Sequence, residues 1–378
     1  MNKMATLIAI SIALISFSPS ATNAGDVPPK IVLPQCPNCA AKSGAMMGAY
    51  SGRSGCMTCG KKRVAQAGKT VQVFILAGQS NMEGHGKVDW GRNPEYDKSK
   101  KGSKREIKGG IGCLRTLATD PRTAPTYKKF LDSEGNWVER DDVFIYTTTS
   151  GKKKGRLSVG FGKGNWFGPE LGFGFQVGDH FEVPVLIIKT AWGGKDLAVD
   201  FRPPSSGDTP LKKTRTAGEY YEKMMAIVKE SLANFEKDFP DLKGCRPQIA
   251  GFGWHQGWND GCSREMTAEY ETNMVNFIND VRKELGVKDL PFVIANTGQN
   301  GPETKGNFAD LCQIQLDIGD PEEHPEFKGT VISIDTRTFK AKEERSPSGF
   351  GYHWNHSGES HFMVGDAMGK AMVELLKK

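Results

Sequence analysis

The chain lacks features that would place it in a membrane or on nucleic acid. Beyond its first residues, no stretch of the 378-residue sequence approaches the roughly 20 consecutive apolar residues of a membrane-spanning helix. The formal net charge is only +6, and no nucleic-acid-binding motif is present. No internal repeat is present, so a repeat architecture is not expected. These absences argue against a membrane-spanning or nucleic-acid-binding protein, and the length after residue 24 is enough for one large domain or two smaller ones.

The one apolar run near the amino terminus has the form of an export signal. Lys3 supplies a positive charge, an apolar run of residues 5–17 follows, and small residues lead to Ala24. A charged start, an apolar middle and a small-residue exit are the parts of a signal peptide. The run is too short to span a bilayer. We therefore expect residues 1–24 to be removed, the protein to be exported (secreted or periplasmic), and no membrane span to remain.

Four of the eight cysteines form two Cys-x2-Cys pairs in a short segment, residues 25–69. The pairs are Cys36 with Cys39 and Cys56 with Cys59, 16 residues apart, which is the spacing of a four-thiolate zinc site. Export favours disulfides instead. Structural zinc and disulfides are therefore both open here. No histidine directly follows either pair, which argues against covalent haem attachment.

Short apolar runs alternate with helical patterns from residue 70 onward. The runs expected as buried strands are 71–76, 183–189, 248–254, 291–296 and 330–335, and the expected helices are 218–238, 264–285 and 358–376. This alternation predicts an α/β fold with a parallel sheet covered on both faces. Functional residues then belong at the carboxyl ends of the strands.

Residues 87–166 are rich in Gly, Lys, Arg and Asp and show no sustained period. We interpret this stretch as a long insertion after the first strand, with a hairpin around residues 134–136. A cleft-shaping insertion and a surface loop are both compatible with this composition.

Ser80 follows the first expected strand in the segment Gly78-Gln79-Ser80-Asn81-Met82. A serine there lies at the carboxyl edge of the sheet and at a helix start, where a backbone N–H suits a developing oxyanion. Taken alone, Ser80 would be interpreted as a helix cap. The pattern is not Gly-x-Ser-x-Gly, so the nucleophile elbow of α/β-hydrolases is not indicated.

Three later segments favour chemistry at Ser80. Gly193 and Gly194 follow the second strand, where paired glycines allow close approach of the backbone to a substrate. Residues 253–260 follow the third strand and carry two amides and a carboxylate, and residues 352–356 supply the imidazoles a serine needs as base.

These motifs together resemble the SGNH-type hydrolases of the sialate O-acetylesterase-like kind, related to family six of the carbohydrate esterases. The segments that carry the resemblance are Gly-Gln-Ser-Asn-Met at 78–82, Gly-Pro-Glu at 168–170, Gly-Gly at 193–194 and Trp-His-Gln-Gly at 254–257. The resemblance spans residues 71–378, so residues 70–378 are expected to form one esterase domain. It implies a three-layer α/β/α sandwich with a central parallel sheet, SGNH or flavodoxin-like, beside the short Cys-rich segment.

The resemblance also implies roles for individual residues. Ser80 attacks an acetyl carbonyl, and His353 takes its proton and returns it to the leaving hydroxyl. The oxyanion is held by the N–H of Ser80, an N–H of Gly193 or Gly194, and the side-chain amide of Gln256. Asn259 is the alternative amide, because the wider SGNH group uses an asparagine in a related motif. His356 is the alternative base.

The carboxylate of the triad is where the sequence departs from its relatives. Trp258 occupies the position of a glutamate that helps orient the histidine in some of them, and Phe350 and Gly351 occupy positions where others carry an aspartate. Asp260 is the expected substitute and Asp335 the alternative, and a Ser-His dyad is a third arrangement.

We therefore expect an exported serine esterase that removes acetyl groups from a carbohydrate without a catalytic cofactor. Two other hypotheses remain open: a catalytically silent carbohydrate-binding protein, and an SGNH esterase that acts on other esters. No nucleic-acid partner is expected.

Overall fold

The computed structural model describes residues 69–89, 110–148 and 151–377. The expected signal peptide and the Cys36, Cys39, Cys56 and Cys59 segment lie outside these residues. No helix in the described part of the chain is long and apolar enough to cross a membrane.

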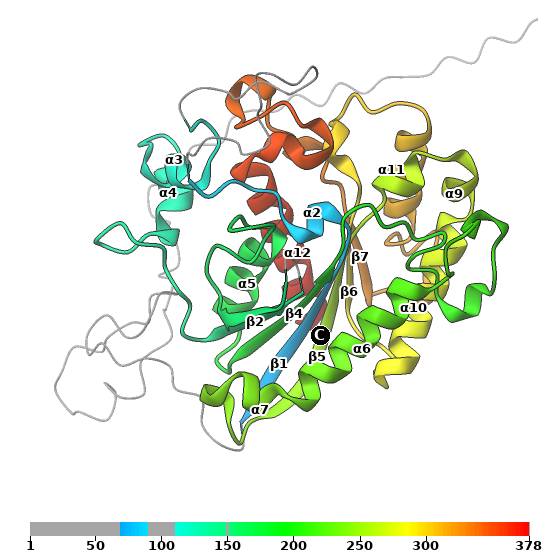
Figure 1. The fold of residues 1–378 in the computed structure, drawn as a ribbon, viewed down its shortest axis with the longest axis horizontal. Helices are drawn as coiled ribbons and strands as arrows, with labels where there is room; N and C mark the ends of the chain where they lie inside the picture. Colours follow the sequence, from blue (N-terminus) through cyan, green and yellow to red (C-terminus); the bar gives the residue numbers. More distant parts are fainter. Residues whose placement is uncertain (1–68, 90–109, 149–150, 378) are drawn as a thin grey trace, which may run out of the picture.

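A seven-stranded sheet forms the centre of the molecule, in the order β3-β2-β4-β1-β5-β6-β7 (Figure 1). All neighbouring strands run parallel except β2 and β3, which are antiparallel. The strands are β1 (Thr70–Gly78), β2 (Val143–Thr147), β3 (Lys153–Arg156), β4 (Val185–Ala191), β5 (Arg246–His255), β6 (Phe292–Ala295) and β7 (Val331–Ile334). The predicted α/β class with a largely parallel sheet is confirmed.

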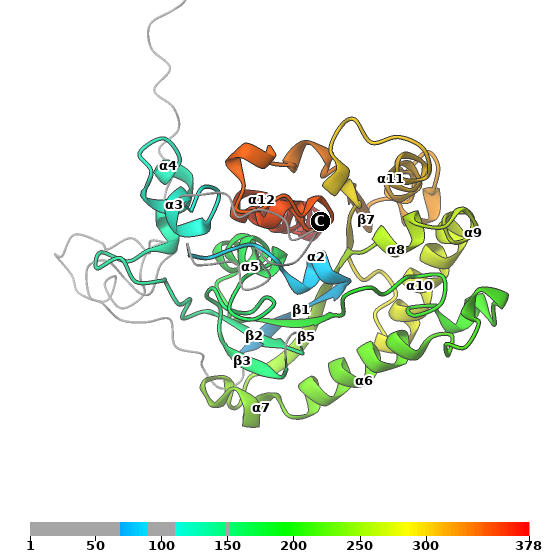
Figure 2. The same cartoon turned by 45° about the horizontal axis from the view of Figure 1, so that its top comes forward.

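Helices cover both faces of the sheet (Figures 1 and 2). Helices α5 and α12 pack together on one face, while α6 and α10 lie on the other. The helices are α2 (Ser80–Glu83), α3 (Leu114–Thr119), α4 (Ala124–Tyr127), α5 (Pro169–His180), α6 (Glu219–Ala233), α7 (Phe235–Asp238), α8 (Trp258–Gly261), α9 (Arg264–Ala268), α10 (Tyr270–Leu285), α11 (Asn307–Asp317) and α12 (Gly358–Leu376). A short 3-10 segment, η9 (Gly351–His356), precedes α12.

Strand β1 shows why the sheet needs a helical layer on each face. Val73 and Ile75 belong to the core beneath α6 and α10, whereas Phe74 and Leu76 belong to the core beneath α5 and α12. Successive side chains of a strand point to opposite faces, so a strand that is apolar at every position must be buried on both sides. The continuous apolar run at 71–76 encodes this arrangement directly.

The stretch 87–166 contains more regular structure than its composition indicates. Strand β2 adds to β4 in parallel, and β3 pairs with β2 in antiparallel fashion at the edge of the sheet. The expected hairpin near residue 135 is present as a single antiparallel bridge between Leu131 and Trp137. The long helical patterns at 218–238 and 264–285 are each divided, into α6 with α7 and α9 with α10.

Candidate active site

The carboxyl ends of the three central strands meet in one row. The backbone of Gly78 at the end of β1 lies in register with Ala191 of β4 on one side and His255 of β5 on the other. Parallel strands present their carboxyl ends at the same edge of the sheet, which is where α/β proteins place their ligands. The segments that follow these ends carry the expected nucleophile and oxyanion donors: Ser80, Gly193, Gly194, Gln256 and Asn259.

Close backbone packing fixes the turn that carries Ser80. A Cβ atom at Gly78 would lie 2.1 Å from the carbonyl oxygen of His255, so only glycine fits there. Gln79 is buried, and its side-chain oxygen accepts a hydrogen bond of 2.9 Å from the N–H of Gly257. Ser80 is the first residue of α2 and Gln79 its N-cap. The nucleophile turn is therefore tied to the β5 loop by backbone and side chain.

A buried ion pair holds the other end of α2. The Nζ of Lys189 donates to the carbonyl oxygen of Glu83 at 2.9 Å, to that of Phe161 at 2.7 Å and to the Glu170 carboxylate at 2.9 Å. Both charged side chains are fully buried. Glu170 also accepts the N–H of Gly168. The Gly-Pro-Glu segment at the start of α5 therefore supports the helix that carries Ser80.

Gly193 lies against Ser80 and Glu83. A Cβ atom at Gly193 would be 3.7 Å from the Cβ of Ser80 and 3.1 Å from a carboxyl oxygen of Glu83. Burial raises the pKa of Glu83, while Lys163, Lys189 and a hydrogen bond from the Gly193 backbone act to lower it. In this structure the Gly193 N–H thus faces a carboxyl group, and a substrate oxygen would compete with Glu83 for it.

The Asp260 side chain is directed toward the loop after β4 and toward Gln256. Its carboxylate accepts the N–H groups of Leu197 at 3.0 Å and Ala198 at 3.0 Å, and a 2.6 Å bond from the amide of Gln256. Burial raises its pKa to about 7, with a further contribution from Asp196. Among the described residues, Asp260 makes no hydrogen bond to a histidine. It joins the loop after β4 to the segment that follows β5.

The two candidate oxyanion amides differ in what they already bind. The Gln256 amide nitrogen donates to the carbonyl oxygen of Lys195 at 3.0 Å and to Asp260 at 2.6 Å, which uses both of its hydrogens. The Asn259 amide nitrogen donates to the carbonyl oxygen of Gly194 at 2.6 Å. An amide nitrogen has two hydrogens, so Asn259 retains one for a further acceptor.

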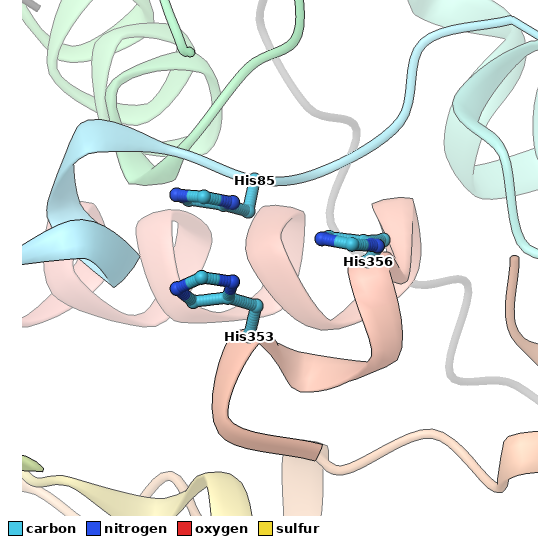
Figure 3. Close-up of side chains that lie close together, drawn as sticks. All are labelled: His85, His353 and His356. Carbon is cyan, nitrogen blue, oxygen red and sulfur yellow. The ribbon is translucent and has the colours of Figure 1, made fainter. Parts of the chain in front are cut away.

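Three histidines gather beside the nucleophile turn (Figure 3). The ring of His353 stacks on that of His85 with centroids 3.7 Å apart, and the His356 ring lies 5.8 Å from His85. The amide of Asn81 donates to the carbonyl oxygen of Tyr352 at 3.1 Å, which joins α2 to η9. Within the described residues, the Ser80 hydroxyl makes no hydrogen bond with an imidazole. Such bonds are often long in a ligand-free site and tighten when substrate binds.

The two candidate bases occupy different surroundings. The His356 ring is fully buried, and its Nδ1 lies 2.8 Å from the hydroxyl of Ser348. The His353 ring is half-buried and makes no hydrogen bond within the described residues. Burial lowers the pKa of His353 to about 4, helped by the charge of Lys163, and it lowers the pKa of His356 further. Both rings are therefore neutral at pH 7, the form that accepts a proton.

Asp335, the alternative acid, is engaged with an arginine. Its carboxylate forms bidentate hydrogen bonds with Arg337, the shortest 2.6 Å, and accepts the Asn296 amide at 3.2 Å. The Arg337 guanidinium holds the pKa of Asp335 below its usual range. Neither Asp260 nor Asp335 is hydrogen-bonded to His353 or His356 in the described part of the chain.

Several residues that lie in the site could not be identified as site residues from the sequence. Lys189 is a lysine inside an otherwise apolar strand, a pattern that signals a buried partner. Glu83 directly follows the Gly-Gln-Ser-Asn-Met segment, yet its position beside Gly193 depends on the pairing of β1 with β4. Ser348 contacts His356 through a loop without periodicity, so no sequence signal pointed to it.

The comparisons with known proteins agree on a carbohydrate esterase. A family model described as carbohydrate esterase, sialic acid-specific acetylesterase, matches residues 70–374. A probable carbohydrate esterase from Arabidopsis thaliana is 24% identical over 226 residues, which cover 59% of this chain and 67% of that protein.

Two solved structures are also similar. An X-ray structure of an Arabidopsis thaliana protein has a TM-score of 0.46 and 17% identity, covering 80% of this chain and 97% of that one. A carbohydrate acetylesterase from Xanthomonas citri has a TM-score of 0.42 and 14% identity, covering 79% of this chain and 55% of that one. Because the family model matches most of the sequence, the chain belongs to the carbohydrate esterase family of sialic acid-specific acetylesterases.

Proposed function

We propose that this protein is an exported serine esterase that hydrolyses acetyl esters on a carbohydrate, with Ser80 as its nucleophile. The observation that carries the proposal is the row of strand ends. The register of β4, β1 and β5 brings the loops of Gly193, Ser80 and Gln256 to one edge of the sheet. Membership of the family supports esterase chemistry and an acetylated carbohydrate as substrate.

The reaction proceeds through an acetyl-enzyme. The Ser80 oxygen attacks the acetyl carbonyl carbon while His353 accepts the hydroxyl proton. The tetrahedral intermediate collapses, the ester C–O bond breaks, and the imidazolium returns the proton to the leaving sugar hydroxyl. Water, deprotonated by His353, then attacks the acetyl-enzyme and releases acetate and free Ser80.

His353 is the preferred base because its ring is the more accessible of the two. It is half-buried and makes no hydrogen bond within the described residues, whereas His356 is enclosed and held by Ser348. The bond from Asn81 to the carbonyl oxygen of Tyr352 keeps His353 next to the nucleophile turn.

We assign the oxyanion to backbone and side-chain donors on the three loops. The N–H groups of Ser80 and Gly194 supply the backbone donors, and the N–H of Gly193 can join them only by leaving the Glu83 carboxyl group. Asn259 supplies the amide, because both amide hydrogens of Gln256 are already used. Loss of one such donor typically lowers kcat by about 10²–10³-fold.

The base works without a carboxylate partner in this proposal, as a Ser-His dyad. Asp260 acts instead as a positioning residue, since it holds the loop after β4 against Gln256. Asp335 is neutralised by Arg337.

The rim of the site offers an aromatic surface for a sugar. The rings of Trp258 and Tyr352 lie with centroids 5.9 Å apart, and Tyr352 is one of two exposed large apolar side chains in the described part of the chain. Tyr352 immediately precedes His353, and Trp258 lies between Gln256 and Asn259 along the chain. Aromatic rings with one face exposed to water are suited to pack against the apolar face of a sugar ring, whose hydroxyl groups lie around its edge.

Hydrolysis of 4-nitrophenyl acetate and of an acetylated sugar by Ser80→Ala tests the proposal. We expect kcat to fall by at least about 10⁴-fold, because the nucleophile and its base act as one unit. Ser133→Ala, in an exposed turn, is the matched control and should retain full activity. Unchanged turnover in Ser80→Ala would refute the proposal. A preference for long acyl chains over acetyl would instead point to another ester class.

A further inference from the structure

We propose that His85, His353 and His356 together form a binding site for a Zn²⁺ ion, and that the bound ion inhibits the enzyme. The inhibitory part rests on the proposed role of His353 as base. The binding part rests only on the arrangement of the three side chains.

The three imidazoles converge from two separate segments of the chain. Each offers a ring nitrogen, and these donor atoms all lie within 4.8 Å of one another. Figure 3 shows the His85 ring over that of His353, with the His356 ring beside the pair and one edge toward it. Three histidines with an open fourth position are a recurrent ligand set for Zn²⁺.

Buried ring nitrogens without a partner among the described residues indicate that this cluster binds a ligand. Both ring nitrogens of His85 and the Nε2 of His356 are buried without a hydrogen-bond partner among residues 69–89, 110–148 and 151–377. More than about 90% of buried polar groups in proteins are paired, and the exceptions often mark an ion or a water molecule. A metal ion at the centre of the cluster would satisfy nitrogens on both histidines at once.

The rings must be rearranged from their present positions before they can bind one ion together. Zn–N bonds are about 2.0–2.1 Å long, which places the nitrogens of a tetrahedral site about 3.4 Å apart. Stacked rings direct their lone pairs into separate planes, so His353 must turn out of its stack on His85. Turning the His353 ring costs its contacts with the rings of His85 and Tyr352 but breaks no hydrogen bond within the described residues. Ser348, by contrast, holds His356 in place.

The ligand atoms select the kind of ion, because the positive charge near the cluster opposes every cation alike. Lys87 and Lys163 place positive charge near His356. Hard cations such as Mg²⁺ depend on carboxylate oxygens, which the cluster lacks, so they should not bind. Ions that form strong bonds with neutral imidazole should bind, with Cu²⁺ above Zn²⁺.

Bound metal would inhibit by occupying the base. The ion takes the lone pair of His353, and that nitrogen can then no longer accept the Ser80 proton. No covalent bond in the protein forms or breaks, so removal of the ion by a chelator restores activity.

Calorimetric titration of the full chain with ZnCl₂ tests the site directly. We expect wild-type protein to bind one equivalent of Zn²⁺ that His85→Gln either does not bind or binds at least about 100-fold more weakly. His180→Gln, at the exposed end of α5, is the matched control and should bind as wild type. His356→Gln should behave as His85→Gln, and MgCl₂ should give no binding. Zinc held by the four amino-terminal cysteines contributes equally to every variant and cancels in the comparison.

The kinetic arm separates this inference from the proposed function. Zn²⁺ should inhibit acetyl-ester hydrolysis by wild type and His180→Gln, with recovery on chelation, while His85→Gln should resist it by at least about 10-fold in metal concentration. Equal binding by wild type and His85→Gln would overturn the site. Binding without inhibition, or with activation, would overturn the inhibitory role. Binding by a protein without esterase activity would uphold the site and refute the proposed function alone.

Discussion

His353 is the residue on which the proposed chemistry depends, and its surroundings are unusual for a general base. Its nearest ring neighbour is another imidazole, His85, and the positive charge of Lys163 helps to lower its pKa. No carboxylate is hydrogen-bonded to it in the described part of the chain. Burial and positive charge both disfavour the imidazolium, so the ring remains neutral well below pH 6.

The pH dependence of kcat/KM should report this environment. The pKa of His353 is lowered to about 4, and only the neutral ring accepts the Ser80 proton. We expect kcat/KM for 4-nitrophenyl acetate to be flat from pH 8 to about pH 5 and to be halved near pH 4. A half-loss near pH 6.5 would show a solvated ring or one supported by a carboxylate, and would contradict the dyad.

Acid unfolding must be separated from this titration. His85, His255, His356 and His361 are buried with lowered pKa values. Protonation therefore favours the unfolded state, and the free energy of unfolding should fall as the pH drops below about 6.5. Only the loss of activity that occurs while the far-UV circular dichroism stays that of the folded protein reflects the titration of His353.

Sequence reasoning at the residue scale was strongest where a motif carried the information. Ser80 and the Gly193 loop were placed at the sheet edge by the strand pattern, and the structure has them there. The partners of Asp260 could not be foreseen, because its contacts with Leu197 and Ala198 depend on how two loops fold over the sheet. The identity of the base and the existence of an acid stay predictions.

Helix α2 is too short to hold its own position. Its four residues depend on the turn at Gly78, on Gln79 and on the Lys189–Glu170 pair beneath its last carbonyl. A single helical turn is unstable in isolation, so tertiary contacts must supply its stability. The geometry of Ser80 therefore depends on residues that never touch the substrate.

Lys189→Met should destabilise the protein and lower its activity. Removal of one partner of a buried ion pair leaves the other charge uncompensated and typically costs about 3–5 kcal/mol. We expect urea unfolding to show a loss of this size in Lys189→Met or Glu170→Leu. We also expect kcat to fall more than KM rises, since α2 loses its support.

The double variant and a surface pair supply the controls. Lys189→Met with Glu170→Leu should cost less than the sum of the single changes, because no unpaired charge remains. Lys152→Met removes the exposed pair with Glu230 and should cost less than about 1 kcal/mol. Additive losses in the double variant would show that Lys189 and Glu170 do not act together.

The sequence predicted some elements better than others, for a physical reason. Strands β1, β4, β5 and β6 lie inside the sheet and β7 lies at one edge, and the short apolar run of each separates it clearly from the helical patterns. Strand β3 reads Lys-Lys-Gly-Arg and lies at the edge. An edge strand can lack an apolar run, as β3 does and β7 at the other edge does not, so nothing in the composition of β3 distinguished it from a loop.

The whole molecule is organised around β1. Its first half buries side chains in two cores, one on each face, and its end delivers Ser80 between the loops that follow β4 and β5. The class of fold and the edge that carries the site both follow from strand–helix alternation. The charged network around that edge depends on packing that no local pattern encodes.

Covalent labelling with a fluorophosphonate tests the central claim most directly, because the probe reacts only with an activated serine. The tryptic peptide of residues 70–87 contains Ser80 as its sole serine, so mass spectrometry of that peptide locates the label. We predict one phosphonyl group per chain, on this peptide, with loss of fluoride and of esterase activity in parallel. A folded protein that stays unlabelled, or that is labelled on another peptide, would contradict the account and favour a silent carbohydrate-binding protein.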